Sequence, residues 1–464
     1  MKRVASATLF FAIGKSMRTL HRSSENSVFI MAAITLSLAL LFGGGQGHLG
    51  DSLTQLTALL LLAALIRHSP DLRRWPKASL WVLLPFLPLL LYLLPWPESF
   101  RVAGEGRQEL IQSLQPVLGN LPIQGSLDPG GTERAAYWLL PASALYLATL
   151  QMSHRQRLKL AALLLGCIFA GAILGLLQKF NGPDSALYFY SNTNRGMAVG
   201  MFANNNHYAI AMAAALPLLW VALLQRINSQ QANPGRLLWI TVLFGAALVF
   251  MLGFILSGSR AGLLLGMLGC ILMLPAVVAG SQRQGVKRWL FAAMATGVLL
   301  SIQLGLYFIA VQFSLDPLQD GRWPIGAVTR EAALVFAPVG SGPGSFFHAF
   351  QSIDGLLFGP LTVNHAHNDF LEIWLESRWL GAAVVFVMLC GFVWQGLRVW
   401  FRAEAFSLAA VLLARAAWIG LVLLIVHSLV DYPMRTTALS ALAGLLAAFL
   451  LLPESERIVE PDAD

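Results

Sequence analysis

The sequence predicts an all-α membrane protein of about twelve transmembrane helices, with one large loop between the ninth and tenth. Of its 464 residues, 57% are hydrophobic and only 12% are charged, whereas about 25% of the residues in a soluble domain are charged. Twelve apolar stretches are long enough, or nearly so, to cross the membrane, which takes ~20 helical residues. They lie at about 28–44, 52–66, 78–95, 135–151, 160–178, 207–224, 237–257, 261–280, 289–313, 379–396, 406–427 and 437–452.

Basic residues are concentrated on one side of this predicted topology. With the amino terminus inside, the cytoplasmic segments that precede the C-terminal tail hold 19 Lys and Arg residues and three acidic residues, whereas the opposite side holds ten basic and fifteen acidic residues. Because positively charged loops stay in the cytoplasm, loops 96–134, 179–206 and 314–378 are predicted to lie outside. The net charge of +8 thus reflects orientation in a membrane, so we expect membrane lipids and no nucleic acid as partners.

The topology divides the chain into three predicted parts. Residues 1–313 form nine helices with the first two outer loops, residues 314–378 form the large outer loop, and residues 379–464 form three helices and an acidic cytoplasmic tail. Polar residues at membrane depth are costly and point to function. The large loop concentrates glycines, histidines and carboxylates, so we expect any chemistry there.

Two arginines beside predicted helix starts indicate an anion site on the outer face. Arg195 follows the aromatic and Asn-rich run YFYSNTN, and Arg260 lies in SGSRAG between two apolar stretches. The small residues around Arg260 leave room for an anion to reach its guanidinium group. Two alternatives remain open: the aromatic residues before Arg195 form an interfacial belt, and Arg260 extends to water at the membrane surface.

The large loop adds two further arginines and a glycine-rich turn. Arg322 and Arg330 flank RWPIGAVTR, and GSGPGSF follows within about ten residues. Gly342 and Gly344 would let backbone N–H groups approach an anion, although glycine and proline also form ordinary turns. The turn has no GKS or GKT after it, which excludes a nucleotide P-loop.

The run NHAHNDFLEIWLE predicts a helix start with imidazoles beside carboxylates. His365 and His367 precede a helical pattern that begins at about Asn368. Steps of three and four place three acids on one face of that helix: Asp369, Glu372 and Glu376. A histidine suits proton transfer near neutral pH, and a carboxylate can orient it. The alternatives are capping histidines beside a solvated acidic face, or a zinc site of both histidines and Glu372.

The predicted helix 406–427 carries a deep charge. A buried Arg415 costs at least ~2.5 kcal/mol in the membrane, so it should face the helix bundle and pair with another helix or, less favoured, a ligand. His427 and Asp431 close this helix on the outer side and either line the site or cap the helix.

Five runs, in order, resemble the bacterial O-antigen ligase and polymerase superfamily. They are NRGMAVGMFANNNHYAIAMAAALP, SGSRAGLLLG, GRWPIGAVTREAALVFAPVGSGPGSF, HAHNDFLEIWLESRWLG and HSLVDYPMR. The similarity covers about residues 190–440, and HAHND preceded by GxGPGSF is its specific part. The resemblance implies a GT-C-like glycosyltransferase of the inner membrane, with its active site on the periplasmic face. Members transfer glycans from undecaprenyl diphosphate to a hydroxyl of lipid A core or of another glycan.

The resemblance also implies roles for individual residues. Arg260 and Arg322 match the arginines that hold the donor diphosphate, and His367 matches the catalytic base. Trp323 and Pro324 follow Arg322 at once, which departs from the family pattern and leaves Arg330 to share or replace its role. The implied mechanism needs no cofactor and no metal ion, because guanidinium groups neutralise the leaving group.

Two other functions fit the sequence less well than ligase-like transfer. A polymerase of O-antigen or exopolysaccharide would use the same donor and the same chemistry. A transporter of polysaccharide or lipid-linked sugar would also have many spans, but transporters place charged residues near the midplane on broken helices. Here only Arg415 lies deep within a predicted span.

Overall fold

The structure, a computed structural model, describes residues 26–45, 48–119, 123–229, 235–281, 321–353 and 362–458, with single residues between 285 and 303 and Phe358. Its described part is helical, without a β-strand beyond two isolated bridges. Within it, seven helices are long and apolar enough to cross a membrane, and three shorter apolar helices accompany them. The prediction of an all-α membrane protein is therefore confirmed.

The helices follow the predicted apolar stretches closely. After a first helix at Asn26–Phe42 come α2 (His48–His68), α3 (Leu83–Leu93), α4 (Glu98–Arg101), α5 (Glu105–Leu118), α6 (Pro129–Leu150), α7 (His154–Asn181), α8 (Asn205–Asn228), α9 (Gly235–Ser257), α10 (Arg260–Gly280), α12 (Arg322–Val335), α13 (Phe346–Gln351), α14 (Asp369–Phe401), α15 (Leu408–His427) and α16 (Thr437–Leu450). Most of the predicted stretch 289–313 lies outside the described residues, and the other eleven each overlap a helix. Twelve spans remain a prediction.

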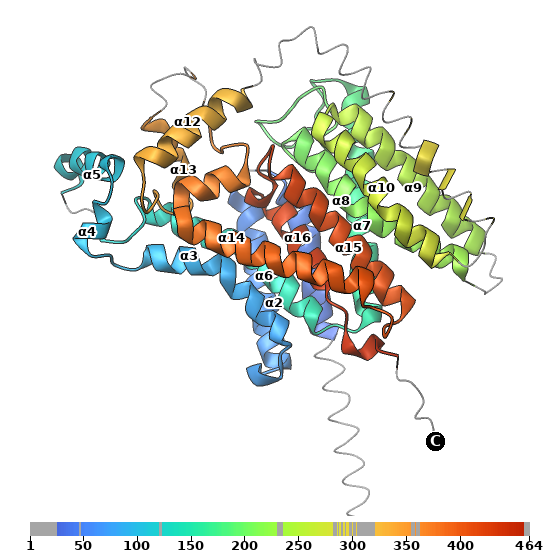
Figure 1. The fold of residues 1–464 in the computed structure, drawn as a ribbon. Helices are drawn as coiled ribbons and strands as arrows, with labels where there is room; N and C mark the ends of the chain where they lie inside the picture. The colour runs from blue at the N-terminus through green and yellow to red at the C-terminus, as the bar shows by residue number, and fades with distance from the viewer. Residues whose placement is uncertain are drawn as a thin grey trace, which may run out of the picture.

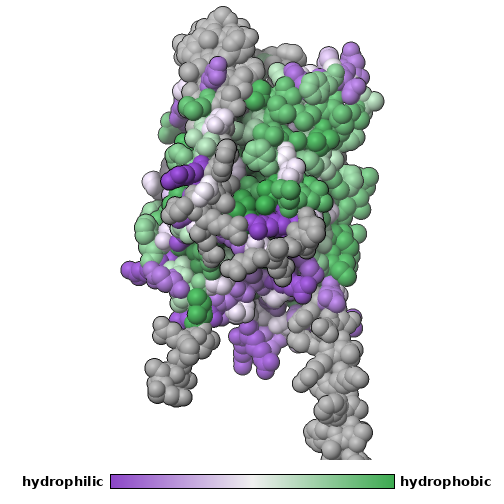
Figure 2. Space-filling view, turned by 90° about the vertical axis from the view of Figure 1, so that its right-hand side faces the viewer, coloured by the Kyte–Doolittle hydropathy of each residue, from purple (hydrophilic) through white to green (hydrophobic). Residues whose placement is uncertain are grey.

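Helix α8 forms the centre of the membrane bundle. Its most apolar 18-residue window is 94% buried, and it packs against α9, α10 and α15. Small residues allow this close approach: a Cβ added at Gly262 of α10 would clash with Ala209 of α8. The outermost helix, α9, exposes Leu237 and Trp239, and Figure 2 shows a wide hydrophobic area on this side of the molecule.

The first and third of the loops that were predicted to lie outside pack together into one unit. Figure 1 shows α4, α5, α12 and α13 gathered at one side of the bundle. Their shared core contains Phe336, Phe346 and Phe350, with Leu110 of α5 packed against it. The fully buried Arg107 stabilises this unit. It donates hydrogen bonds to the carbonyls of Gly340 (2.5 Å), Gly125 (2.6 Å) and Arg101 (2.8 Å).

Helix α14 joins two predicted elements, the helix that starts at about Asn368 and the span that starts at 379. It begins at Asp369 and is kinked at Arg378, whose φ of 44° is not helical, so that two helical segments meet there. The guanidinium of Arg378 lies over Trp374, 4.3 Å from its ring centre, and donates to the carbonyl of Ala333 (3.0 Å). A short helical segment and one kink therefore connect the histidine-rich turn to the apolar part of α14.

Candidate active site

The HAHND turn leads into α14 through a side-chain cap. The side chain of Asn368 accepts a hydrogen bond from the Leu371 N–H (2.9 Å) and donates to the carbonyl of Leu429 (2.9 Å). His367 has a φ of 49°, in the left-handed region that few non-glycine residues adopt. This turn separates the two histidines, so that His365 and His367 contact different carboxylates.

Asp431 is the buried centre of a cluster of three histidines and one arginine. Its Oδ1 lies 3.3 Å from His367 Nδ1 and 3.7 Å from His207 Nε2, and its Oδ2 lies 3.6 Å from Arg322 Nη2 and 3.8 Å from His427 Nε2. Burial raises the pKa of Asp431, but the imidazoles of His207 and His367 outweigh burial and hold that pKa well below its ordinary value. The carboxylate therefore keeps its negative charge.

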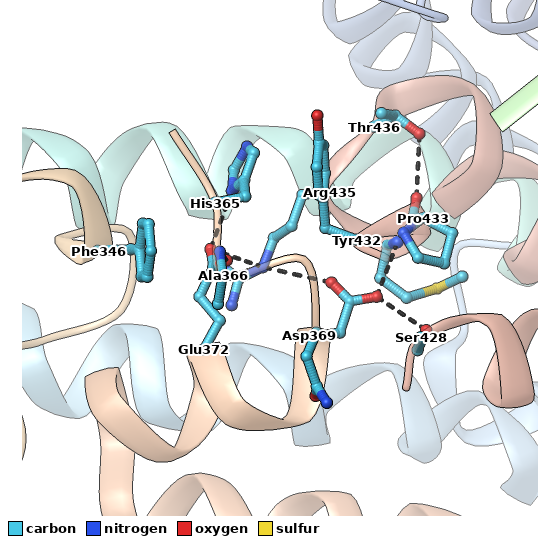
Figure 3. Close-up of polar contacts among 12 residues, drawn as sticks. Phe346, His365, Ala366, Asp369, Glu372, Ser428, Tyr432, Pro433, Arg435 and Thr436 are labelled. Carbon is cyan, nitrogen blue, oxygen red and sulfur yellow. Dashed lines mark hydrogen bonds and ion pairs between the residues drawn. The ribbon is translucent and has the colours of Figure 1, made fainter. Parts of the chain in front are cut away.

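A second network, next to the first, surrounds Arg435 (Figure 3). This guanidinium faces the three acids of α14, at 3.8 Å from Asp369, 3.4 Å from Glu372 and 3.0 Å from Glu376. Glu372 in turn contacts His365 Nδ1 (3.0 Å) and accepts from the Ala366 N–H (2.8 Å). Burial lowers the pKa of Arg435, but the three carboxylates outweigh it and raise that pKa above its ordinary value.

The glycine-rich turn binds a carboxylate of the chain itself. The N–H of Gly344 donates to Glu376 Oε1 (2.8 Å), and that of Gly342 donates to the Glu376 carbonyl (2.8 Å). Both glycines have positive φ, and a Cβ would clash with Ser126 at Gly342 and with Gly131 at Gly344. These two N–H groups thus support the fold around α14, and they are occupied by Glu376.

Three of the predicted residues meet around one pocket. Arg260, Arg322 and His367 line a hollow of about 310 Å³, together with Asn205, Asn206, Gly258, Ala261, Gly321 and Ile325. Arg322 and His367 keep 32% and 25% of their side chains exposed. These three residues are spread over more than 100 positions of the sequence, and the fold brings them together.

The pocket is lined by the first residues of three helices. Asn205 begins α8, Arg260 begins α10 and Arg322 begins α12. Two hydrogen bonds tie the first two starts together: Asn205 donates to the Ser257 carbonyl (2.8 Å), and Ser259 donates to Asn206 (2.7 Å). Each helix start carries a partial positive charge of about +0.5, so the pocket combines helix dipoles with arginine charges.

Two other predicted arginines, Arg330 and Arg195, are not among the lining residues. Arg330 is exposed on α12, eight residues after Arg322. Arg195 donates to the carbonyl of Pro183 (3.1 Å) and lies over the ring of Tyr188 (5.6 Å).

Arg415, the arginine predicted to lie deep in a span, pairs with the end of α14. It donates to the carbonyls of Val399 and Trp400 (both 3.3 Å).

The zinc alternative requires His365, His367 and Glu372 to share one point in space. Glu372 contacts His365, whereas His367 contacts Asp431. In the part of the chain that the structure describes, no three His, Cys, Asp or Glu side chains are grouped as a metal ion would require.

Sequence reasoning missed two residues at the site, His207 and Arg435. His207 is 2% exposed in the first turn of α8, and a histidine entering the most buried helix was a usable signal. Arg435 lies four positions after Asp431, and its three acidic partners were recognised without it.

A scan of protein-family models and a search of curated proteins give no match to this chain. Function is therefore inferred from the pocket and its residues.

Proposed function

We propose that this protein is a glycosyltransferase of the inner membrane. It moves a glycan from undecaprenyl diphosphate to a hydroxyl acceptor at the periplasmic face, in the manner of an O-antigen ligase. One observation carries the proposal: two arginines and a histidine from three separate segments, Arg260, Arg322 and His367, line the same pocket. Their chemistry matches the two needs of the reaction, a stabilised leaving group and an activated hydroxyl.

The donor diphosphate binds between Arg260 and Arg322. Each guanidinium can donate two parallel hydrogen bonds to phosphate oxygens, and the starts of α8, α10 and α12 add further positive potential. The volume of about 310 Å³ is at the lower end of the range for ligand pockets. We therefore assign the diphosphate and the first sugar to this pocket, and the polyprenyl chain to the lipid.

His367 is the general base. Its Nδ1 lies against Asp431 and is buried, so Nε2 is the nitrogen left to accept a proton. The acceptor hydroxyl gives its proton to Nε2 as its oxygen bonds to the anomeric carbon. The bond from that carbon to the diphosphate breaks, and the electron pair leaves with the phosphate oxygen. Attack opposite the leaving group inverts the anomeric centre.

Guanidinium groups meet the charge that develops on the diphosphate, so we propose that transfer does not depend on a metal ion. Ligase and polymerase share this donor and this chemistry, and differ only in the acceptor. Lipid A core is the acceptor we favour, and a second glycan chain is the alternative.

The test uses the purified protein in nanodiscs with an undecaprenyl-diphosphate-linked glycan. Lipid A core and free glycan are supplied as acceptors in separate reactions, and products are separated by mass. We expect a transferred glycan with one acceptor, and none from the Arg260→Ala, Arg322→Ala double variant. Donor movement across liposomes without any transfer would instead support a transporter and overturn the proposal.

A further inference from the structure

We infer that Tyr432 is a positioning residue that holds the imidazole of His367 in its working orientation. The inference rests on the proposed role of His367 as the base. The ring of Tyr432 contacts three imidazoles at once: His365 at 4.4 Å between ring centres, and His207 and His367 at 4.9 Å each. No function is assigned to Tyr432 in the mechanism above, yet it lies at the junction of both polar networks.

The imidazole of His367 needs support from its neighbours, because the backbone of His367 does little to fix its position. Its φ of 49° places it in a sparsely populated conformation. Among the described residues, its ring forms one ion pair, with Asp431 at 3.3 Å from Nδ1, and that contact alone would leave the ring free to turn about the Nδ1 edge. The Tyr432 ring packs at 74° to the imidazole, and this edge-to-face contact holds the imidazole at a second point.

Tyr432 is itself held rigidly. It follows Asp431 directly, and its N–H donates to Asp431 Oδ1 (2.9 Å). The next residues form the short helix Pro433–Arg435, which Asp369 fixes by accepting from the Met434 N–H (3.2 Å). One anchored segment thus presents a carboxylate and an aromatic ring to the same imidazole.

The ring of Tyr432, and not its hydroxyl, performs this role. Burial, followed by the charge of Asp431, raises the pKa of the Tyr432 phenol to about 12, and the hydroxyl interacts with the side chains of Asn204 and Asn364. A neutral phenol with such partners takes no proton from a substrate. Figure 3 shows the ring standing beside His365 and Arg435.

The test compares Tyr432→Phe, which keeps the ring, with Tyr432→Leu, which removes it. We expect Tyr432→Phe to retain most of the wild-type kcat, and Tyr432→Leu to lower kcat by about 10- to 100-fold through misplacement of the base. The KM for the lipid-linked donor should stay within about twofold in both, because the arginines bind the diphosphate. Tyr137→Leu, at a tyrosine that is 50% exposed on α6, is the matched control.

A second measurement does not depend on transfer. Diethyl pyrocarbonate modifies accessible imidazoles, and peptide mass analysis gives the rate at His367. That rate should rise in Tyr432→Leu and stay at the wild-type level in Tyr432→Phe. If melting shows that Tyr432→Leu is unfolded, Tyr432→Met, also without a ring, replaces it.

The inference falls if the ringless variant keeps the kcat and the modification rate of Tyr432→Phe, or if Tyr432→Phe loses as much kcat as the ringless variant. An inactive wild-type protein would overturn the proposed function alone, because the modification rates would still report the confinement of His367.

Discussion

Oδ1 of Asp431 lies 3.3 Å from Nδ1 of His367, and the carboxylate is fully buried. A buried acid in this position fixes which imidazole nitrogen faces the substrate and stabilises the imidazolium that forms, as in catalytic triads. The same carboxylate lies 3.6 Å from Arg322. Asp431 therefore contacts both the proposed base, His367, and a residue proposed to bind the diphosphate, Arg322. It is the first residue to test.

Replacing Asp431 by Asn should lower transfer by roughly 10²- to 10⁴-fold, because the amide keeps the shape but not the charge that orients His367. The measurement is kcat with saturating lipid-linked donor. Asp128→Asn is the control: Asp128 also lies near a histidine, 3.6 Å from His348, but its side chain is partly exposed and it does not line the pocket. Wild-type turnover in Asp431→Asn would remove Asp431 from the mechanism.

The same carboxylate predicts a pH dependence of stability. The pKa of Asp431 is held well below its ordinary value in the folded protein, so its contribution is fully present above the unfolded-state pKa of ~3.9. It is lost as pH falls through the folded-state pKa. The gap in melting temperature between wild type and Asp431→Asn should shrink as the pH falls below about 4. A difference in melting temperature that increases as the pH falls would contradict this prediction.

The helices were predictable from the sequence, because twenty apolar residues have few alternatives to a transmembrane helix. Even the tight break before Arg260 was recognised as two helices, and the structure separates them at Ser257 and Arg260. The start of α14 was also predicted, at about Asn368 from the helical spacing, and the hydropathy pattern placed the start of the span at 379, directly after the kink at Arg378.

The chemistry-bearing segments were also visible, but their pairing was not. His365 and His367 are two positions apart, yet each contacts a carboxylate from a different part of the fold. Asp431 reaches His367 only because the end of α15 lies beside the start of α14, where the Asp369 N–H donates to the Ser428 carbonyl (2.9 Å). No local pattern in the sequence encodes this tertiary contact. Arg107 illustrates the same limit: its three partners are backbone carbonyls, which carry no sequence signal.

The arginines of the pocket give a prediction about donor binding. Arg260→Ala and Arg322→Ala should each reduce transfer by about 10²-fold or more, since charge stabilisation of the leaving group is lost. Arg260→Lys and Arg322→Lys should recover little, because the planar fork is absent. Arg330→Ala is the matched control, as Arg330 lies on the same helix as Arg322 but is exposed. Full activity in both alanine variants of the pocket would refute the diphosphate site.

Membrane orientation can be tested by cysteine labelling. In a variant with Cys167, Cys270 and Cys390 replaced by Ala, Gln108→Cys should react with an impermeant thiol reagent added to the periplasm. Arg73→Cys should react only after the membrane is opened. Both positions are exposed, so accessibility of the side chain does not limit either reaction. The reason is the concentration of Lys and Arg on one side, and the reverse labelling pattern would invert the topology.

The two histidines of the HAHND turn should differ in their effect on catalysis. His367→Ala should abolish transfer, with a loss of about 10²- to 10⁴-fold, yet leave donor binding near the wild-type level, because Arg260 and Arg322 hold the diphosphate. His365→Ala should cost less, since His365 is buried against Glu372 and Tyr432 and does not line the pocket. Donor binding and turnover are measured separately on the same preparations.

Activity of the wild-type protein should persist in EDTA, because the proposal assigns the leaving-group charge to guanidinium groups. The control is the same preparation without chelator, assayed at the same donor concentration. An enzyme that loses activity in EDTA and regains it with zinc would make the histidines metal ligands. In that case His365→Ala would be as damaging as His367→Ala, and the assignment of His367 as a general base would fail together with the metal-independent mechanism.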